Sequence, residues 1–179
     1  MPDVTDEDLI ARCKDGSDEA FAELVRRYRS MVFGLIARTV GDRQRAEDLA
    51  QEVFLRVHRG LPYFRGAARV STWLYRIVIN VCLQERSVPS TLDVTLDESR
   101  VDQLRSREDW AGSLELRDRL GKALARLPAP QRLLIAAHYL NGVRYEDLAE
   151  AFDMPLGTVK THLYRAKRQL RQLLATEFK

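Results

Sequence analysis

Positively charged and hydrogen-bonding side chains gather on one side of a predicted helix near the C-terminus. The helix begins near Leu156, and its polar face carries Thr158, Lys160, Thr161, Tyr164, Arg165, Lys167, Arg168 and Arg171. No carboxylate follows on this helix before Glu177. Such a face presents donors and positive charge, and the DNA major groove is wide enough to admit an α-helix. An ordinary solvated face is the competing interpretation, because charge alone supports only solubility or non-specific binding.

A helix-turn-helix would position this face. The apolar side of the second helix is one stripe at helical period, formed by Val159, Leu163, Ala166, Leu170 and Leu173. A short amphipathic helix from Tyr145 precedes it, and the break falls at Asp153, Met154 and Pro155. Proline suits the first turn of a helix, and Gly157 lets the backbone approach a phosphate. This context favours DNA docking over a solvated face.

Composition and charge describe a globular protein. The chain has 179 residues, 45% hydrophobic and 31% charged, which is enough for one large or two small domains. Residues 1–83 hold 13 basic against 12 acidic residues, residues 84–118 hold 5 against 9, and residues 119–179 hold 11 against 5. The basic surplus therefore lies where the candidate DNA-reading helix lies, as expected for an electrostatic footprint.

Several classes of protein are disfavoured. Cys13 and Cys82 are too few and too far apart for a zinc site or a disulfide framework, which favours buried free cysteines over redox-sensitive ones. No apolar run approaches the roughly 20 residues that a membrane span needs, and the N-terminus is acidic, so we expect no membrane insertion and a cytoplasmic protein. The three histidines are scattered, with no nucleophile motif, phosphate loop or metal-ligand spacing. We expect no enzyme, no metal and no cofactor.

The remaining pattern is helical throughout. Capping residues are expected at Thr5, Ser17, Asp42 and Ser71, each before a segment with apolar residues at helical spacing. We therefore predict a four-helix domain in residues 1–86. We predict a second helical domain, which ends in the helix-turn-helix, in residues 113–179. Residues 87–112 are acidic and without clear period, which predicts a flexible acidic linker. The predicted fold class is all-α, with two small helical domains.

Five segments, in this order and spacing, resemble the extracytoplasmic-function (ECF) group of the bacterial sigma-70 family of RNA polymerase sigma factors. The resemblance covers nearly the whole chain, and its segments are AFAELVRRY (20–28), AEDLAQEVFLRVHR (46–59), FRG with STWLYRIVIN (64–80), LPAPQRLL (127–134) and GTVKTHLYRAKRQL (157–170). The resemblance implies a region 2-like domain followed by a region 4-like domain.

In this family the helix that carries a motif like DLAQEVF docks on the clamp of core RNA polymerase. The resemblance assigns this docking to Asp48, Gln51, Glu52, Leu55 and Arg56, because Leu49, Val53 and Phe54 are needed for the core. A solvated amphipathic face is the alternative.

The family's next segment reads and melts the −10 promoter element by capturing an extruded base, which needs stacking surfaces, cations and a polar pocket. The residues that match are Tyr63, Phe64, Arg65, Arg69, Trp73, Arg76 and Asn80. The period of its neighbours favours Trp73 as a core residue over a stacking platform. Asn80 is the better candidate for a base contact, because an amide both donates and accepts.

The resemblance also implies that the helix-turn-helix reads the −35 element. The resemblance assigns contacts with base edges to Lys160, Thr161, Tyr164 and Arg165. It assigns contacts with phosphates to His162, Lys167 and Arg168, together with the backbone amides of Gly157 and Thr158. Because arginine and lysine most often select guanine, a purine-rich half-element that contains guanine is expected.

Two positions depart from the family pattern. Many relatives continue the helix after Asn80 with an aspartate and a run of arginines, whereas this chain reads Gln84, Glu85, Arg86, Ser87. The missing cations predict weak melting or dependence on a near-consensus promoter. Asp153 replaces the glycine of many helix-turn-helix turns, and aspartate tolerates left-handed dihedrals.

The sequence thus predicts a promoter-specificity subunit whose partners are core RNA polymerase, promoter DNA and an anti-sigma factor. A free-standing helix-turn-helix regulator that binds DNA without polymerase is the alternative. The clamp-docking motif and the lack of an obvious ligand pocket in the first half disfavour it.

Overall fold

The computed structural model describes residues 4–85 and 114–177, and in the second range it describes the side chains of residues 119–176. The helices are α1 (Asp6–Lys14), α2 (Asp18–Val40), α3 (Arg43–Gly60), α4 (Val70–Gln84), α5 (Leu114–Ala125), α6 (Ala129–Ile135), α7 (Tyr145–Ala151) and α8 (Leu156–Glu177), with a 3-10 turn η1 (Leu61–Tyr63) and a π-helical turn η2 (Ala136–Leu140). Neither described range contains a strand, so the predicted all-α class is confirmed. The predicted linker, 87–112, lies outside the described residues.

Side-chain caps fix where the first three helices begin. Thr5 forms a capping box with Asp8, in which each side chain binds the other residue's backbone N–H. The Thr5 hydroxyl also donates to the Asp8 carboxylate at 2.8 Å, and this bond, together with the one from the Thr5 backbone N–H, lowers the pKa of Asp8. Ser17 caps α2 and Asp42 caps α3 through their side-chain oxygens. All three predicted caps are confirmed.

The predicted cap at Ser71 is wrong. Helix α4 begins one residue earlier, at Val70, and the extended residue before it is Arg69, whose side chain makes no capping bond. The backbone N–H of Trp73 donates to the Arg69 carbonyl at 3.0 Å, which closes the first turn. Val70 is only 4% exposed, so burial of this apolar side chain draws it into the helix and places Ser71 inside the first turn.

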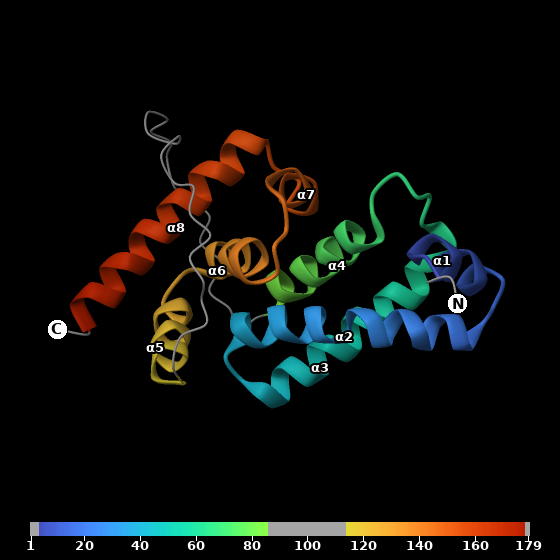
Figure 1. The fold of residues 1–179 in the computed structure, drawn as a ribbon, viewed down its shortest axis with the longest axis horizontal. Helices are drawn as coiled ribbons and strands as arrows, with labels where there is room; N and C mark the ends of the chain where they lie inside the picture. The colour runs from blue at the N-terminus through green and yellow to red at the C-terminus, as the bar shows by residue number, and fades with distance from the viewer. Residues whose placement is uncertain (1–3, 86–113, 178–179) are drawn as a thin grey trace.

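The first half packs around α2. Helices α1, α3 and α4 all contact it, and α3 also packs against α4 (Figure 1). The predicted inward residues Leu24, Leu35, Val53, Leu74 and Val78 are completely buried. Their burial confirms the apolar stripes read from the sequence.

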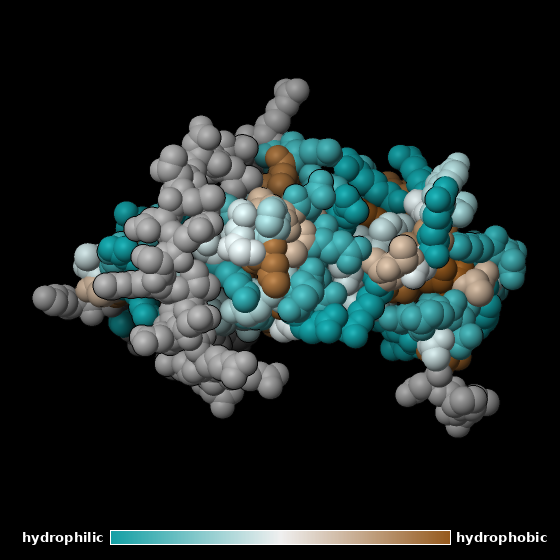
Figure 2. Space-filling model, turned by 90° about the horizontal axis from the view of Figure 1, so that it is seen from above, coloured by the Kyte–Doolittle hydropathy of each residue, from teal (hydrophilic) through white to brown (hydrophobic). Residues whose placement is uncertain are grey.

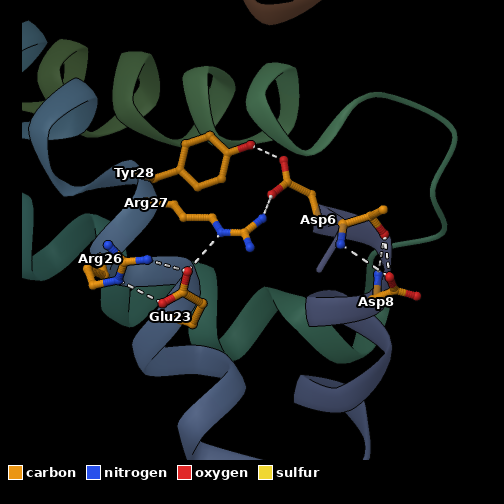
Figure 3. Close-up of polar contacts among 7 residues, drawn as sticks. Asp6, Asp8, Glu23, Arg26, Arg27 and Tyr28 are labelled. Atoms are coloured by element: carbon orange, nitrogen blue, oxygen red, sulfur yellow. Dashed lines mark hydrogen bonds and ion pairs between the residues drawn. The ribbon is translucent and has the colours of Figure 1, made fainter. Parts of the chain in front are cut away.

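A polar network ties α1 to α2 (Figure 3). The Tyr28 hydroxyl donates to the Asp6 carboxylate, and Arg27 lies between Asp6 at 3.2 Å and Glu23 at 3.0 Å. Arg26 also pairs with Glu23. Hydrogen bonds from Arg26 and Arg27 lower the pKa of Glu23 to about 2, whereas burial and Asp6 raise the pKa of Tyr28. The short first helix is thereby held on the bundle by charge as well as by Leu9 and Ile10.

The second half packs around α6. Every residue of α6 is buried, and α8 packs against α5, α6 and α7. Pro128 precedes α6 at its N-cap position, as the sequence predicted for a residue that ends one helix and opens the next. The predicted stripe on α8 is confirmed, because Val159, Leu163, Ala166 and Leu170 are all buried.

The two halves also contact each other. Helix α4 packs against α6 and α7, and α2 packs against α5 and α6, so α2 extends beneath both halves (Figure 1). The sequence analysis did not predict this contact. The described face seen in Figure 2 is largely hydrophilic, with hydrophobic side chains showing only in small patches.

Candidate nucleic-acid interface

The helix-turn-helix is formed by α7, a four-residue turn and α8. Asp153 has φ 53°, and it is the single non-glycine residue with positive φ in the described ranges. It therefore takes the left-handed role that glycine usually fills, as predicted. Pro155 lies just before α8 rather than inside its first turn, and its carbonyl accepts from the backbone N–H of Val159 at 3.1 Å.

The polar face of α8 differs in exposure along its length. Gly157, Arg168 and Arg171 are exposed, whereas Thr158, Lys160, Tyr164, Arg165 and Lys167 are half-buried. The ammonium group of Lys167 lies 5.4 Å from the centre of the Tyr139 ring, a cation–π contact that draws this side chain toward η2. The exposed guanidinium groups of Arg168 and Arg171 are therefore free to move in solvent, whereas the half-buried residues form a more rigid surface.

Two predicted DNA contacts on α8 are buried in this structure, which corrects the expectation that both face DNA. Thr161 is 7% exposed and its hydroxyl donates to the Gly157 carbonyl, as threonine does inside helices. His162 is 9% exposed because it lies three residues after Val159 and flanks the apolar stripe. Burial, and the nearby Arg165, lower the pKa of His162, so its ring carries no charge for a phosphate at neutral pH.

The predicted −10 residues occupy the η1 turn, the loop after it and one side of α4. Tyr63 is 83% exposed, and Arg65, Arg69, Arg76 and Asn80 are exposed as well. Trp73, Arg76 and Asn80 lie at helical spacing and so share one side of α4. These residues combine an aromatic surface, three cations and an amide within a short stretch of chain.

Trp73 packs against neighbouring side chains of the fold, and it is also a candidate for contact with DNA. Its ring packs on Phe64 with the ring centres 4.7 Å apart, and both residues are half-buried. Trp73 also lies against Gly60, where a Cβ atom would come within 2.9 Å of the indole ring. Lys14 donates to the Phe64 carbonyl at 2.6 Å and so ties this loop to α1. The structure thus places the indole between the core and the surface.

The predicted polymerase-docking residues lie on α3. Asp48 and Gln51 are exposed, and Leu55 is 51% exposed, which is high for a large apolar side chain. Glu52 and Arg56 form an ion pair at 2.7 Å, and Arg56 also donates to Gln84 at the end of α4. Asp48, Gln51 and Leu55 can therefore bind a partner as they stand, whereas Glu52 and Arg56 would have to give up their ion pair.

The sequence analysis missed a groove between α2 and α3. It has a volume of about 1270 Å³, and its apolar lining includes Phe21, Val25, Phe33, Ala50, Phe54 and Leu55. Three arginines, Arg26, Arg29 and Arg43, lie along it. The signal in the sequence was the width of the apolar face on α2, which is broader than burial against one neighbour requires.

Other kinds of site are not found among the described residues. They contain no group of three or more histidine, cysteine or acidic side chains placed to hold a metal ion. No helix in the two described ranges combines the length and the apolar character needed to span a bilayer.

Comparison with known proteins finds a family model that matches each half of the chain. A family model for sigma-70 region 2 matches residues 24–87, and a model for sigma-70, region 4 matches residues 117–170. The RNA polymerase sigma-H factor of Pseudomonas aeruginosa is 32% identical over 94% of this chain and 93% of its own length. The ECF RNA polymerase sigma-E factor of Escherichia coli K12 is 34% identical over 93% of each chain.

Two solved structures share the fold. The structure of CnrH in complex with the cytosolic domain of CnrY has a TM-score of 0.70, with 23% identity over 94% of this chain and 96% of that chain. The sigma factor RpoE of Bartonella quintana, in complex with the anti-sigma factor NepR, has a TM-score of 0.64, with 23% identity over 88% of this chain and 98% of that chain. At this identity the likeness concerns the fold.

Proposed function

Because this chain belongs to the ECF group of the sigma-70 family of RNA polymerase sigma factors, we propose that it binds core RNA polymerase and directs it to promoters, without catalysis of its own. The observation that carries the proposal is the pairing of two surfaces in one chain. A basic helix-turn-helix lies in one half, and an aromatic and cationic turn beside α4 lies in the other. Residues 1–86 and 113–179 form the two working domains, and the site of action is the cytoplasm.

The −35 element is read by α8. Arg165 and Lys160 are half-buried and so are restricted in direction, which suits contacts to base edges. Arg168 is exposed near the middle of the same face and suits phosphate contact. Thr161 and His162 reach DNA only if their surroundings change, because both are buried here.

The contrast between Arg165 and Arg168 supplies a direct test of −35 reading. Replacing Arg165 by Ala should cost about 1–3 kcal/mol of binding at one base position and relax the preference there. Replacing Arg168 by Ala, the matched control, should weaken binding equally on all sequences and reduce the salt dependence of binding by about one phosphate contact. Binding of each variant to single-base variants of the −35 element measures both effects. Equal loss on every sequence for Arg165→Ala would assign it to the backbone instead.

The −10 element is read by the loop after α3 and by α4. Tyr63 is the most exposed aromatic residue of this region and is available to stack on an unpaired base. Asn80 and Arg76 lie on the exposed side of α4, where an amide and a guanidinium can meet a base edge and the strand backbone. The chain continues into Gln84 and Glu85, and Glu85 pairs with Arg45. This acidic end supports dependence on a near-consensus promoter.

Polymerase and an anti-sigma factor are the proposed protein partners. Gln51 and Leu55, two of the predicted docking residues, line the α2–α3 groove. An apolar floor beside three arginines suits an amphipathic helix with acidic residues at its margins. Two proteins of the same fold are held in complexes with CnrY and with the anti-sigma factor NepR, which supports a partner of this kind.

Transcription in vitro with purified core polymerase tests the proposal. Genomic fragments serve as templates, and specific initiation should appear only when this chain is added. Leu55→Glu places a charge at the rim of the groove and should abolish polymerase binding while leaving the fold intact. Failure of the unaltered chain to bind core polymerase, together with retained sequence-specific DNA binding, would favour the free-standing regulator.

A further inference from the structure

Helix α1 is fixed to the first-half bundle and also lies against the turn that carries the −10 residues. At the start of α1, the Asp6 carboxylate accepts from the Tyr28 hydroxyl and from Arg27, both on α2 (Figure 3). Leu9 and Ile10, in the middle of α1, are 1% and 5% exposed and pack in the core. On its other side α1 contacts the turn η1. The helix therefore connects α2 to the region that is proposed to read the −10 element.

Lys14 joins α1 to the loop of residues 64–69, which follows η1 and is called the −10 loop below. Its ammonium group donates to the backbone carbonyl of Phe64 at 2.6 Å, across 50 positions of the chain. Lys14 lies in the last turn of α1, and the chain just beyond it is also fixed, because the backbone N–H of Ser17 donates to the Arg12 carbonyl at 3.0 Å. The bond to Phe64 therefore starts from a helix whose two ends are both held.

Phe64 is held through its ring, its backbone N–H and its carbonyl. The ring packs on Trp73, with the ring centres 4.7 Å apart, and the N–H donates to the Leu61 carbonyl at 3.2 Å. Leu61 is 3% exposed and Trp73 is half-buried, so these two contacts belong to the packed bundle. The contact with the carbonyl comes from Lys14, which is exposed. Loss of Lys14 would therefore release the carbonyl while the ring and the N–H stay in place.

The carbonyl of Phe64 sets the direction in which the −10 loop leaves the bundle. It belongs to the peptide group that joins Phe64 to Arg65, and Arg65, Gly66 and Ala67 are all exposed. Gly66 has φ 73°, in the left-handed region that glycine adopts readily, and a glycine resists rotation of the backbone very little. An exposed loop with such a residue needs an anchor at its start. Lys14 supplies this anchor at the last peptide group before the exposed residues.

We propose that Lys14 is a positioning residue for −10 recognition: from α1 it holds the Phe64 carbonyl and thereby keeps the −10 loop in the conformation that binds an unpaired base. This role rests on the proposed function, which assigns −10 reading to the same loop. Lys14 acts through Phe64 and does not itself contact DNA. Without the bond the loop occupies several conformations, and the apparent affinity for the −10 strand falls by the fraction that is competent to bind.

Three variants of the full chain separate positioning from a simple loss of charge. Lys14→Met removes the ammonium group but keeps a long side chain, and Lys14→Arg restores a cationic donor. Arg12→Met, the matched control, removes one charge from another exposed position of α1. Each variant is bound to core polymerase, and its affinity is measured for the single non-template strand of a promoter found in the transcription assay. Lys14→Met should bind this strand up to about fivefold more weakly, whereas Lys14→Arg and Arg12→Met should bind it about as well as the unaltered chain does.

The salt dependence of binding distinguishes positioning from a direct phosphate contact. If Lys14 bound a phosphate, Lys14→Met would reduce the slope of log affinity against log salt by about 0.7, the value for one contact with a single strand. Positioning predicts the same slope for Lys14→Met as for the unaltered chain, with weaker binding at every salt concentration. Binding to an isolated −35 duplex should not change, because the −10 loop lies in the other half of the chain.

The fluorescence of Trp73 reports on the same bond without DNA. In a Trp110→Phe background Trp73 is the sole tryptophan, and its indole packs on Phe64. Release of the Phe64 carbonyl in Lys14→Met should change the emission of Trp73, and Lys14→Arg should restore it. An unchanged emission in Lys14→Met would show that Lys14 does not hold Phe64, and the proposal would fail.

The binding results separate this role from the proposed function. Equal affinity of Lys14→Met and the unaltered chain for the −10 strand would overturn the positioning role. A reduced salt slope in Lys14→Met would make Lys14 a phosphate contact, and equal losses in Lys14→Met and Arg12→Met would assign the effect to charge, so either result would overturn it as well. If the unaltered chain on core polymerase shows no preference for the −10 strand, the proposed function fails, and the emission of Trp73 still decides whether Lys14 orders the loop.

Discussion

Adding one methyl group at Gly60 should disturb the −10 surface from beneath. Gly60 is the last residue of α3, with φ −84° and ψ −21°, so alanine can adopt its backbone conformation without strain. A Cβ atom there would lie 2.9 Å from Cζ2 of Trp73, closer than side-chain atoms tolerate. The indole is rigid and packs on Phe64, so it has to move as a unit. We therefore expect Gly60→Ala to displace both aromatic side chains.

Gly34 offers a matched control with the same clearance. A Cβ atom at Gly34 would also lie 2.9 Å from its nearest neighbour, but that atom is Nη1 of Arg38, the end of a flexible side chain. Overpacking against a rigid group costs about 1–3 kcal/mol. Replacing glycine by alanine inside a helix gains about 1 kcal/mol. Gly34→Ala should keep this gain, whereas Gly60→Ala should lose it, so the two free energies of unfolding should differ by about 1–3 kcal/mol.

Thermal unfolding followed by circular dichroism measures the difference. For a chain of this size, 1 kcal/mol corresponds to about 2–4 °C in Tm, so a gap of several degrees is expected. In a Trp110→Phe background Trp73 is the sole tryptophan, and its fluorescence should change in Gly60→Ala but not in Gly34→Ala. Promoter opening should fall in Gly60→Ala while binding to an isolated −35 duplex is unaffected. Equal Tm values with unchanged fluorescence would show that the indole does not lie against Gly60.

Two further predictions concern buried titratable groups. Burial raises the pKa of Cys82 to about 12, whereas Cys13 is partly exposed, so iodoacetamide at pH 8 should alkylate Cys13 and spare Cys82 until the chain is unfolded in urea; equal rates in the folded protein would contradict this. Burial lowers the pKa of His162 below its usual 6.5, so the folded state binds this proton less well than the unfolded state. The stability that depends on neutral His162 is present above pH 6.5 and is lost as the pH falls toward the lowered pKa, so His162→Gln should flatten the pH dependence of urea unfolding between pH 7 and pH 5.5.

Local signals in the sequence were enough to define most helices. The caps at Thr5, Ser17 and Asp42 depend on hydrogen bonds between residues three positions apart, so neighbouring residues determine them. The left-handed conformation of Asp153 is equally local. Ser71 was mistaken for a cap because the burial of Val70 depends on the rest of the bundle, and tertiary packing overrides a capping preference.

The candidate site was predicted less completely than the helices. The resemblance to the family selected Tyr63, Arg76 and Asn80, and the structure exposes all three. Helical period placed Thr161 on the wet side of α8, where the structure buries it. The α2–α3 groove was missed because a groove is a property of two helices and the space between them, whereas a periodic pattern describes one helix at a time.

The contact between the halves connects residues that no local pattern relates. Thr72 and Asp147 are 75 positions apart, and Arg132 and Thr39 are 93 positions apart. The sequence still carries one indirect sign, since α4 is buried on two sides. Leu74 and Val78 serve the first-half core, whereas Thr72, Tyr75 and Ile79 share another side of the helix.

The composition of that second side bears on whether the halves can part. Two of its three residues, Thr72 and Tyr75, carry hydroxyl groups that water can satisfy when the contact opens, so exposing them costs less than exposing an equal aliphatic surface. A permanent core would place aliphatic residues there, as the side of Leu74 and Val78 does. The two buried sides of α4 therefore differ in chemistry, because the side of Leu74 and Val78 is aliphatic, whereas the side that contacts α7 carries the hydroxyl groups of Thr72 and Tyr75.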